Sequence, residues 1–248
     1  MTYGKFAYLY DDLMKDVPYD EWVRFLQIQV QTYGVEGQKI LDLACGTGEL
    51  SIRLSSAGFE VTGVDLSAEM LTVAREKADR GGLTLFLVEQ DMSQLELPGV
   101  FDIIGIFCDS VNYLQEETEI IHTFERALKH LKTNGLFLFD VHSLYKMTEL
   151  FANQTYAYNG EEISYIWQCF EGEYPYSVEH ELSFFELDHE TGQYHRYDEL
   201  HYQRTFTIEQ YQNWLEETGF ELLSVTADFQ DEKPGPHAER IFFTARKK

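Results

Sequence analysis

The segment "KILDLACGTGEL", residues 39–50, decides the fold, because it joins an apolar run to a turn that contains two glycines. The apolar run reaches an acid, Asp42, and the turn places Gly46 and Gly48 directly before a segment with helical spacing. Glycine lets the backbone approach a bound ligand closely, since it has no Cβ. This stretch therefore predicts a buried strand, a ligand-binding turn and a helix.

On either side of this turn the chain alternates short apolar runs with amphipathic segments. Helical spacing with charged faces occurs near 48–57, 67–80 and 116–132, and the runs "KILDLA", "FEVTGVD", "LTLFLVE", "FDIIGIF" and "GLFLFDV" are typical of buried strands. Such alternation predicts a parallel sheet covered by helices on both faces. A last helix is expected in "TIEQYQNWLEETG", between a cap at Thr207 and a stop at Gly219. Two final runs, "FELLSVTADF" and "RIFFTARK", predict an antiparallel edge hairpin that completes seven strands.

Residues 155–206 interrupt this pattern with segments rich in Tyr, Phe and Trp. Asn159-Gly160 between strand-like runs is a strong hairpin signal, and "EGEYPYS" and "DHETGQ" offer two further reversals. We expect four antiparallel strands, inserted after the fifth strand of the main sheet. The predicted division is a core of residues 1–154 and 207–248, with 1–37 as a helical cover, and an inserted sheet at 155–206.

Composition and charge restrict the functions that the chain can have. Nineteen basic residues against 43 acidic residues give a net charge of −24, which repels polyanions, and the terminal "ARKK" is the closest approach to a basic cluster. Nucleic acid is therefore disfavoured as a substrate, although an RNA-modifying activity stays open. The three cysteines lack the close pairs of a zinc site or a disulfide framework, so no metal is expected. No stretch approaches the roughly 18 apolar residues of a membrane span, and a cytoplasmic protein without a membrane partner is expected.

Three ligands compete for the glycine turn: a mononucleotide phosphate, a dinucleotide pyrophosphate and the amino-acid end of S-adenosylmethionine. A dinucleotide fingerprint requires a third glycine where Ser51 stands, and a P-loop requires a Lys that "GTGELS" lacks. A carboxylate such as Asp42 adds little to an anion site but attracts a ligand that bears an ammonium and a sulfonium. The turn therefore favours a cationic adenosyl ligand.

"LDLACGTG" resembles motif I of the class I S-adenosylmethionine-dependent methyltransferases, with Ala44 where glycine is commoner. The resemblance covers about 38–145 and 207 to the end, and it implies a Rossmann-like α/β fold. It also implies that Asp65 binds the ribose hydroxyls, that Asp91 and Met92 contact the adenine, and that Asp109, Ser110 and Asn112 lie at the active-site mouth. Each acid has a simpler interpretation, since Asp42, Asp65 and Asp91 can each cap the turn or helix that follows.

The segments "FAYLYDDLM" and "PYDEWVRF" resemble the short helices that cover the cofactor in small-molecule methyltransferases, and packing on the core is the alternative. His142, just past the fifth strand, is placed where a substrate-facing residue is expected, or else is a packed histidine. The resemblance implies three catalytic candidates, His142, Asn112 and Asp109. It implies a cofactor-binding set of Tyr10, Trp22, Arg24, Asp42, Ala44, Cys45, Gly46, Gly48, Asp65, Leu66, Asp91, Met92 and Asp109.

The resemblance implies direct in-line transfer of the sulfonium methyl to a small-molecule acceptor, with S-adenosylhomocysteine as product. An acidic, aromatic-lined mouth is expected and favours an amine-bearing acceptor, as in amino-sugar and glycine or sarcosine N-methyltransferases. The inserted sheet is expected to cover the acceptor side or to join two subunits of a homodimer, and not to bind cofactor. The alternatives are an RNA or protein methyltransferase, a non-catalytic cofactor-binding module that acts through partners, and a nicotinamide-dependent oxidoreductase, which the missing third glycine disfavours.

Overall fold

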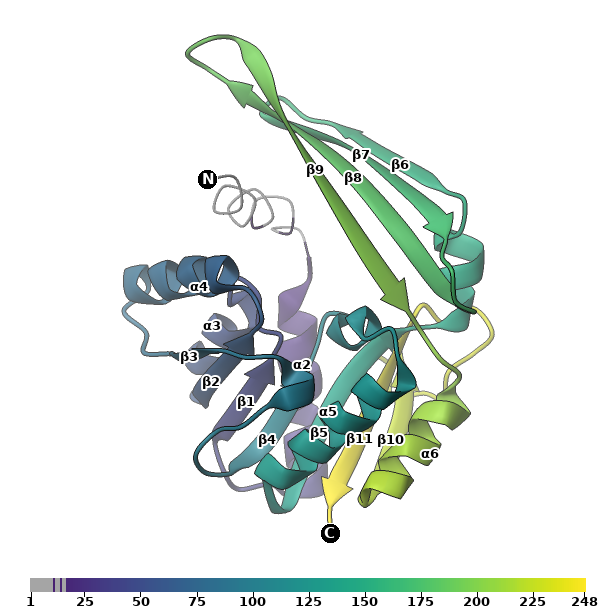
Figure 1. Ribbon diagram of the computed structural model, residues 1–248. Coiled ribbons are helices and arrows are strands. Elements are labelled where there is room, and N and C mark those ends of the chain that lie inside the picture. The colour runs from purple at the N-terminus through teal and green to yellow at the C-terminus, as the bar shows by residue number, and fades with distance from the viewer. Residues whose placement is uncertain (1–10, 12–13, 15–16) are drawn as a thin grey trace.

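The computed structural model describes residues 11, 14 and 17–248 and contains two separate β-sheets (Figure 1). The larger sheet has seven strands in the order β10-β11-β5-β4-β1-β2-β3. Strands β1 to β5 run parallel, and β11 is antiparallel to both of its neighbours. The predicted mostly parallel sheet with an antiparallel C-terminal hairpin is confirmed. Its strands are β1 (Lys39–Leu43), β2 (Glu60–Asp65), β3 (Phe86–Glu89), β4 (Phe101–Ile106), β5 (Leu131–His142), β10 (Phe220–Ala227) and β11 (Arg240–Lys247).

Helices cover both faces of this sheet (Figure 1). The helices are α2 (Tyr19–Tyr33), α3 (Glu49–Ser56), α4 (Ala68–Arg80), α5 (Glu117–His130) and α6 (Ile208–Thr218), with short helices η1 (Met92–Gln94), η2 (Ser110–Tyr113) and η3 (Lys146–Phe151). The cap and stop predicted for α6 are present, because Thr207 Oγ1 accepts a hydrogen bond from Gln210 N and Gly219 has a φ of 103°. Within the described part of the chain, no helix is long and apolar enough to cross a membrane.

Two apolar clusters hold the helices to the sheet. On one face Phe139 stacks on Phe243 with ring centroids 4.7 Å apart, and residues of α5 and α6 pack around them. On the other face Leu26 of α2 and Leu54 of α3 pack on inward residues of the central strands. The parallel strands are thus buried on both sides, which explains why their sequences are continuous apolar runs.

The smaller sheet is antiparallel and rises above the edge at which the parallel strands end (Figure 1). It consists of β6 (Thr155–Asn159), β7 (Ile163–Glu171), β8 (Ser177–Asp188) and β9 (Gln193–Arg204) in sequential order. The first hairpin forms where it was predicted, but its turn differs from the expected one. Asn159 still pairs with Ser164, which leaves four residues, 160–163, between the paired positions, and neither Asn159 nor Gly160 has a positive φ, so these two residues do not form a two-residue Asn-Gly turn.

Candidate active site

Three acids stand at the carboxyl ends of three neighbouring strands. Asp42 is on β1, Asp65 is the last residue of β2, and Asp91 follows β3. Strand β2 pairs in parallel with both β1 and β3, and a backbone hydrogen bond of 3.0 Å from Gln90 N to Asp65 O joins the ends of β2 and β3. The topology thus brings the three predicted acids to one edge of the sheet.

The two glycines of the turn differ in what they contact. A Cβ on Gly48 would lie 2.9 Å from Ala74 Cβ, so Gly48 is required by the packing of α4 on the turn. A Cβ on Gly46 would meet no atom within 4 Å, and Gly46 N donates a 2.7 Å hydrogen bond to Asp65 Oδ2. Gly46 and the preceding Ala44 both have positive φ, at 54° and 57°. Gly46 therefore faces open space and is the glycine that a ligand would approach.

A hollow of about 120 Å³ lies beside this turn. Its volume is below the roughly 300–1,000 Å³ of a complete small-molecule site, so it has room for only part of such a ligand. Burial raises the pKa of Asp42 to about 7, although a 2.5 Å hydrogen bond from Ser51 opposes the shift. The lining contains three acids and, among the described residues, no Lys or Arg, which suits a cationic ligand. It consists of Met14, Tyr19, Asp42, Ala44, Cys45, Gly46, Thr47, Glu49, Leu50, Phe107, Cys108, Asp109, Ser110 and Tyr113.

The ribose and adenine candidates lie outside this lining, farther along the same edge. Asp65 also accepts a 2.9 Å hydrogen bond from Ser67 N, and Ser67 itself caps α4. Asp91 caps η1 and accepts two 2.8 Å hydrogen bonds from Ser93, which lower its pKa although partial burial opposes them. Leu66 is largely exposed and Met92 is half-buried. The contacts of Asp91 in the structure thus agree with the capping interpretation, and a role in adenine binding stays a prediction.

The turn after β4 is strained and is held by a buried acid that the sequence analysis missed. Cys108 and Asp109 have φ values of 55° and 54°, which non-glycine residues adopt at a cost. Asp140 on β5 is fully buried, and its carboxylate accepts 2.9 Å hydrogen bonds from the backbone N–H groups of both residues. Trp22 Nε1 donates to the same carboxylate at 2.8 Å, and Arg240 forms an ion pair with it. A signal existed in the sequence, because an acid inside the apolar run "GLFLFDV" is rarely buried without partners.

The Asp109 side chain is held from three directions. Arg240 Nη2 lies 2.9 Å from Oδ1, Gln203 Nε2 donates to Oδ2 at 2.8 Å, and His142 Nε2 lies 3.3 Å from Oδ2. Burial alone would raise the pKa of Asp109, but His142 and Arg240 hold it well below its usual range. Burial lowers the pKa of His142, so the imidazole is neutral at physiological pH. Asp109 is therefore a fixed carboxylate.

The structure brings the three catalytic candidates together, but Asn112 serves to hold strand ends. Its Nδ2 donates to Arg204 O at 2.8 Å and its Oδ1 accepts from His142 N at 2.9 Å, and the side chain is fully buried. Asn112 thus connects the end of β9 to the end of β5. His142 is also buried, and its Nδ1 has no partner among the described residues.

The structure does not place the described N-terminal candidates, Trp22 and Arg24, in the lining of the hollow. Trp22 is buried against Asp140 and Arg240, behind the Cys108–Asp109 turn, and does not line the hollow. Arg24 has a 71% exposed side chain that pairs with Glu21 at 3.8 Å, and it is not among the lining residues either. Tyr10 lies outside the described residues. Residues two positions apart on a helix point to different sides, so Trp22 and Arg24 of α2 could not both face one site.

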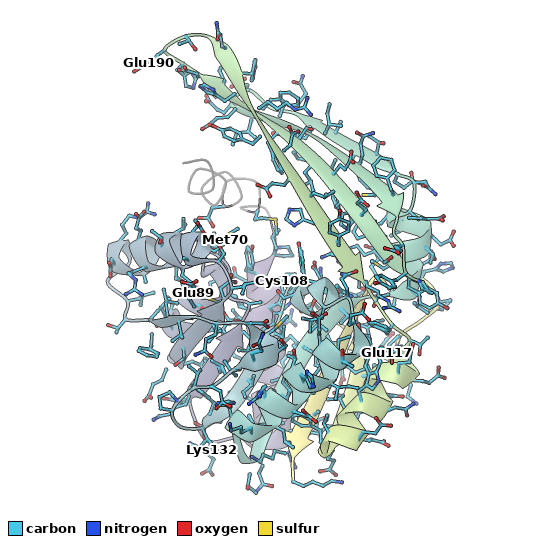
Figure 2. The ribbon with its side chains drawn as sticks, viewed as in Figure 1. Met70, Glu89, Cys108, Glu117, Lys132 and Glu190 are labelled. Atoms are coloured by element: carbon cyan, nitrogen blue, oxygen red, sulfur yellow. The ribbon has the colours of Figure 1, made fainter. Side chains whose placement is uncertain are left out.

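A second, larger cavity of about 330 Å³ lies between the inserted sheet and the core. Figure 2 shows Cys108 at the upper edge of the parallel sheet, below the inserted sheet. Met14, Asp109 and Tyr113 line this cavity as well as the hollow beside the glycine turn. The remaining lining is His142, Lys146, Phe151, Tyr165, Trp167, His180, Leu182, Phe184, His201, Gln203 and Arg240.

A chain of hydrogen bonds crosses the inner face of the inserted sheet and ends at Asp109. Trp167 Nε1 donates to His180 Nδ1 at 3.0 Å, and His180 Nε2 lies 3.1 Å from Gln203 Oε1. The Gln203 amide nitrogen then donates to Asp109. Burial lowers the pKa of His180 to about 4, so this histidine is neutral and donates from Nε2. The sequence analysis missed His180 and Gln203, because no local pattern distinguishes them from other residues of an aromatic strand.

Comparison with known proteins identifies the class to which these features belong. A family model described as "Methyltransferase domain" matches residues 40–135. The crystal structure of an S-adenosylmethionine-dependent methyltransferase from Clostridium acetobutylicum ATCC 824 is similar over 100% of this chain and 99% of that chain, with a TM-score of 0.90 and 32% identity. The chain belongs to the class I S-adenosylmethionine-dependent methyltransferases, and its cofactor is S-adenosylmethionine.

Among individual relatives, a protein named "Putative methyltransferase" from Geobacillus sp. (strain WCH70) is 52% identical over 248 residues and is covered, like this chain, over its full length. The structure of the sugar N-methyltransferase KedS8 from Streptoalloteichus sp. ATCC 53650 is similar over 97% of this chain and 93% of the KedS8 chain, with a TM-score of 0.78. At 21% identity, this second likeness shows the fold alone.

Proposed function

We propose that the protein methylates a small-molecule amine that binds in the 330 Å³ cavity under the inserted sheet. The observation that carries this proposal is the wall formed by Met14, Asp109 and Tyr113, which the cavity shares with the hollow beside the glycine turn. A donor in the hollow and an acceptor in the cavity would meet at this wall. The residues of motif I, with Asp65 and Asp91, would hold the cofactor.

The size of the cavity and the charge of the protein support a small acceptor. A volume of about 330 Å³ falls within the usual range for small-molecule sites and would admit only one base or side chain of a macromolecule. The net charge of −24 opposes the approach of nucleic acid. The structural neighbour KedS8 is named a sugar N-methyltransferase, which agrees with this proposal.

The chemistry of the lining supports an amine as the acceptor, although the lining is less acidic than the sequence predicted. Asp109 is the one acid of the described lining; it pairs with Arg240, and the same lining contains a second cation, Lys146. Aromatic rings and neutral histidines supply most of the remaining wall. Burial lowers the pKa of both His180 and His201. Such surroundings disfavour an ammonium ion and would lower the pKa of a bound amine, so the amine would present a free lone pair.

The catalytic task of the protein is then mainly orientation. S-adenosylmethionine supplies a methyl group that is already activated as a sulfonium, so the acceptor needs only a lone pair in line with it. The aromatic wall from Tyr165, Trp167 and Phe184 fixes the acceptor, and correct placement of two reactants can contribute several kcal/mol to lowering a barrier. His142 faces Asp109 and serves to hold that carboxylate. The inserted sheet acts as a lid on the acceptor side.

The experiment uses a substitution inside the cavity and a matched one outside. Leu182→Trp would fill the cavity, while Ile166→Trp places the same ring on the exposed outer face of the sheet. Each protein is incubated with S-adenosylmethionine labelled in its methyl group and with small-molecule, RNA and protein fractions of a bacterial extract. We expect label in the small-molecule fraction for the wild type and for Ile166→Trp, and its loss in Leu182→Trp with S-adenosylhomocysteine binding retained. Label in the RNA or protein fraction alone would contradict the proposal.

A further inference from the structure

We infer that Asp109 makes the cofactor site selective for a positively charged donor over the neutral product, so that methyl transfer itself loosens the spent cofactor. This inference rests on the proposed acceptor cavity, because it takes the wall between the two hollows as the place of transfer. The described partners of the Asp109 carboxylate are Arg240, Gln203 and His142.

The placement of Asp109 is the first step of the reasoning. A methyl group that passes from the hollow beside Gly46 into the cavity under the inserted sheet has to cross the wall that both share. Of the three residues of that wall, Met14 and Tyr113 are uncharged and Asp109 is a carboxylate. The charged atom that carries the methyl group would therefore lie beside Asp109.

The rigidity of Asp109 is the second step. Its backbone N–H is fixed by Asp140 at 2.9 Å, and its two oxygens are held by Arg240 at 2.9 Å and Gln203 at 2.8 Å. Arg240 is itself shared with Asp140, so this one cation is balanced by two carboxylates and leaves the cluster with a net negative charge. Hydrogen bonds to the charged form keep Asp109 ionised. A fixed charge at this position costs no reorganisation when a cation approaches.

The change of charge during the reaction is the third step. The acceptor lone pair forms the new C–N bond while the electron pair of the C–S bond returns to sulfur, and the positive charge moves from sulfur to nitrogen. A carboxylate beside the sulfur attracts the donor and gains nothing from the thioether product. The other acids of the hollow beside the glycine turn, Asp42 and Glu49, are not on the shared wall. Their interaction with the cofactor should therefore depend little on the charge of the sulfur.

The test is a set of calorimetric titrations with S-adenosylmethionine, S-adenosylhomocysteine and sinefungin, which carries an amine near the position of the sulfonium. In the wild type, sinefungin is expected to bind more tightly than S-adenosylhomocysteine. Asp109→Asn removes the carboxylate and leaves Arg240 facing the ligand. It should therefore weaken the binding of S-adenosylmethionine and of sinefungin about tenfold. The affinity for S-adenosylhomocysteine should change less than about twofold. Glu49→Gln, the matched carboxylate of the first hollow, should leave the ratio of affinities unchanged.

Arg240→Gln is a second variant, with the opposite expected effect. It removes the cation that pairs with Asp109, so it should increase the preference for the charged ligands. Wild-type protein that binds S-adenosylhomocysteine as tightly as sinefungin, or an Asp109→Asn protein that loses affinity for all three ligands alike, would overturn the inference. No acceptor is present in these titrations. A wrong acceptor class therefore leaves their outcome unaffected, and the two proposals can fail separately.

Discussion

Replacing Asp140 by alanine is the sharpest test of how the site is built. The carboxylate of Asp140 accepts three N–H groups, from Trp22, Cys108 and Asp109, and pairs with Arg240. Asp140→Ala leaves these donors buried without an acceptor. It also releases the two residues with positive φ from the contact that holds them.

The expected loss of stability follows from these contacts. Each buried donor without a partner costs about 1–3 kcal/mol, and breaking a buried ion pair from one side costs about 3–5 kcal/mol. Because water can enter the space left by the carboxylate, we expect a total of about 3–5 kcal/mol. For a chain of this length, that lowers the melting temperature by about 6–20 °C. The released turn lines the cofactor hollow, so affinity for S-adenosylhomocysteine should fall by about tenfold or more, which is about 1.4 kcal/mol.

The measurements are thermal unfolding followed by circular dichroism and calorimetric titration below the melting temperature. Asp102→Ala is the matched control: Asp102 is a buried acid on the adjacent strand β4, but it binds Lys39 N and Lys132 at the opposite edge of the sheet. The control should lose stability and keep its affinity for S-adenosylhomocysteine. The reasoning is refuted if Asp140→Ala, still folded, binds S-adenosylhomocysteine as the wild type does.

Three further predictions concern the cofactor side. Asp65→Ala should weaken S-adenosylhomocysteine binding by about 1.5–3 kcal/mol in calorimetry, and unchanged affinity would remove Asp65 from the site. Gly46→Val should abolish this binding, whereas Gly58→Val, which also has a positive φ and free space but lies in the loop after α3, should retain it. Asp42 has a pKa of about 7, so below that pH it is protonated and must lose its proton when a cationic ligand binds. The affinity for S-adenosylmethionine should therefore increase as the pH is raised from about 5.5 to 7, by up to tenfold per pH unit. Asp42→Asn should flatten this rise; a flat wild-type profile would contradict it.

Local patterns were sufficient for the fold and for the acids that follow successive strands. The sheet edge that gathers Asp42, Asp65 and Asp91 follows from the parallel order of the strands, because the carboxyl ends of parallel strands share one edge. The hairpin at Asn159 was also predictable, although its turn was not. The choice between a two-residue turn and a longer one depends on the strand register, which the pairing of the whole sheet determines.

The contacts that complete the site could not be predicted in this way. Arg240 meets Asp109 across 131 positions of the chain, and Gln203 meets it across 94. No periodicity or motif relates residues so far apart, and only the folded topology does. Arg24 is a different case: a likeness of sequence placed it at the cofactor, and in the structure its side chain is largely exposed and pairs with Glu21, so its role in cofactor binding stays a prediction.

These distant contacts also change how the inserted sheet should be understood. The end of β9 is fastened to the core: Gln203 binds Asp109, Asn112 binds Arg204 O, and Thr205 Oγ1 donates to His142 O at 2.6 Å. The base of the insertion thus helps to fix a carboxylate on the wall that the two cavities share. Tyr165, Trp167 and Phe184, by contrast, lie on strands β7 and β8 and line only the 330 Å³ cavity that we propose for the acceptor. Under this proposal, changes of acceptor can be accommodated on β7 and β8 without disturbing the hollow beside the glycine turn, whereas a change at Gln203 would affect both.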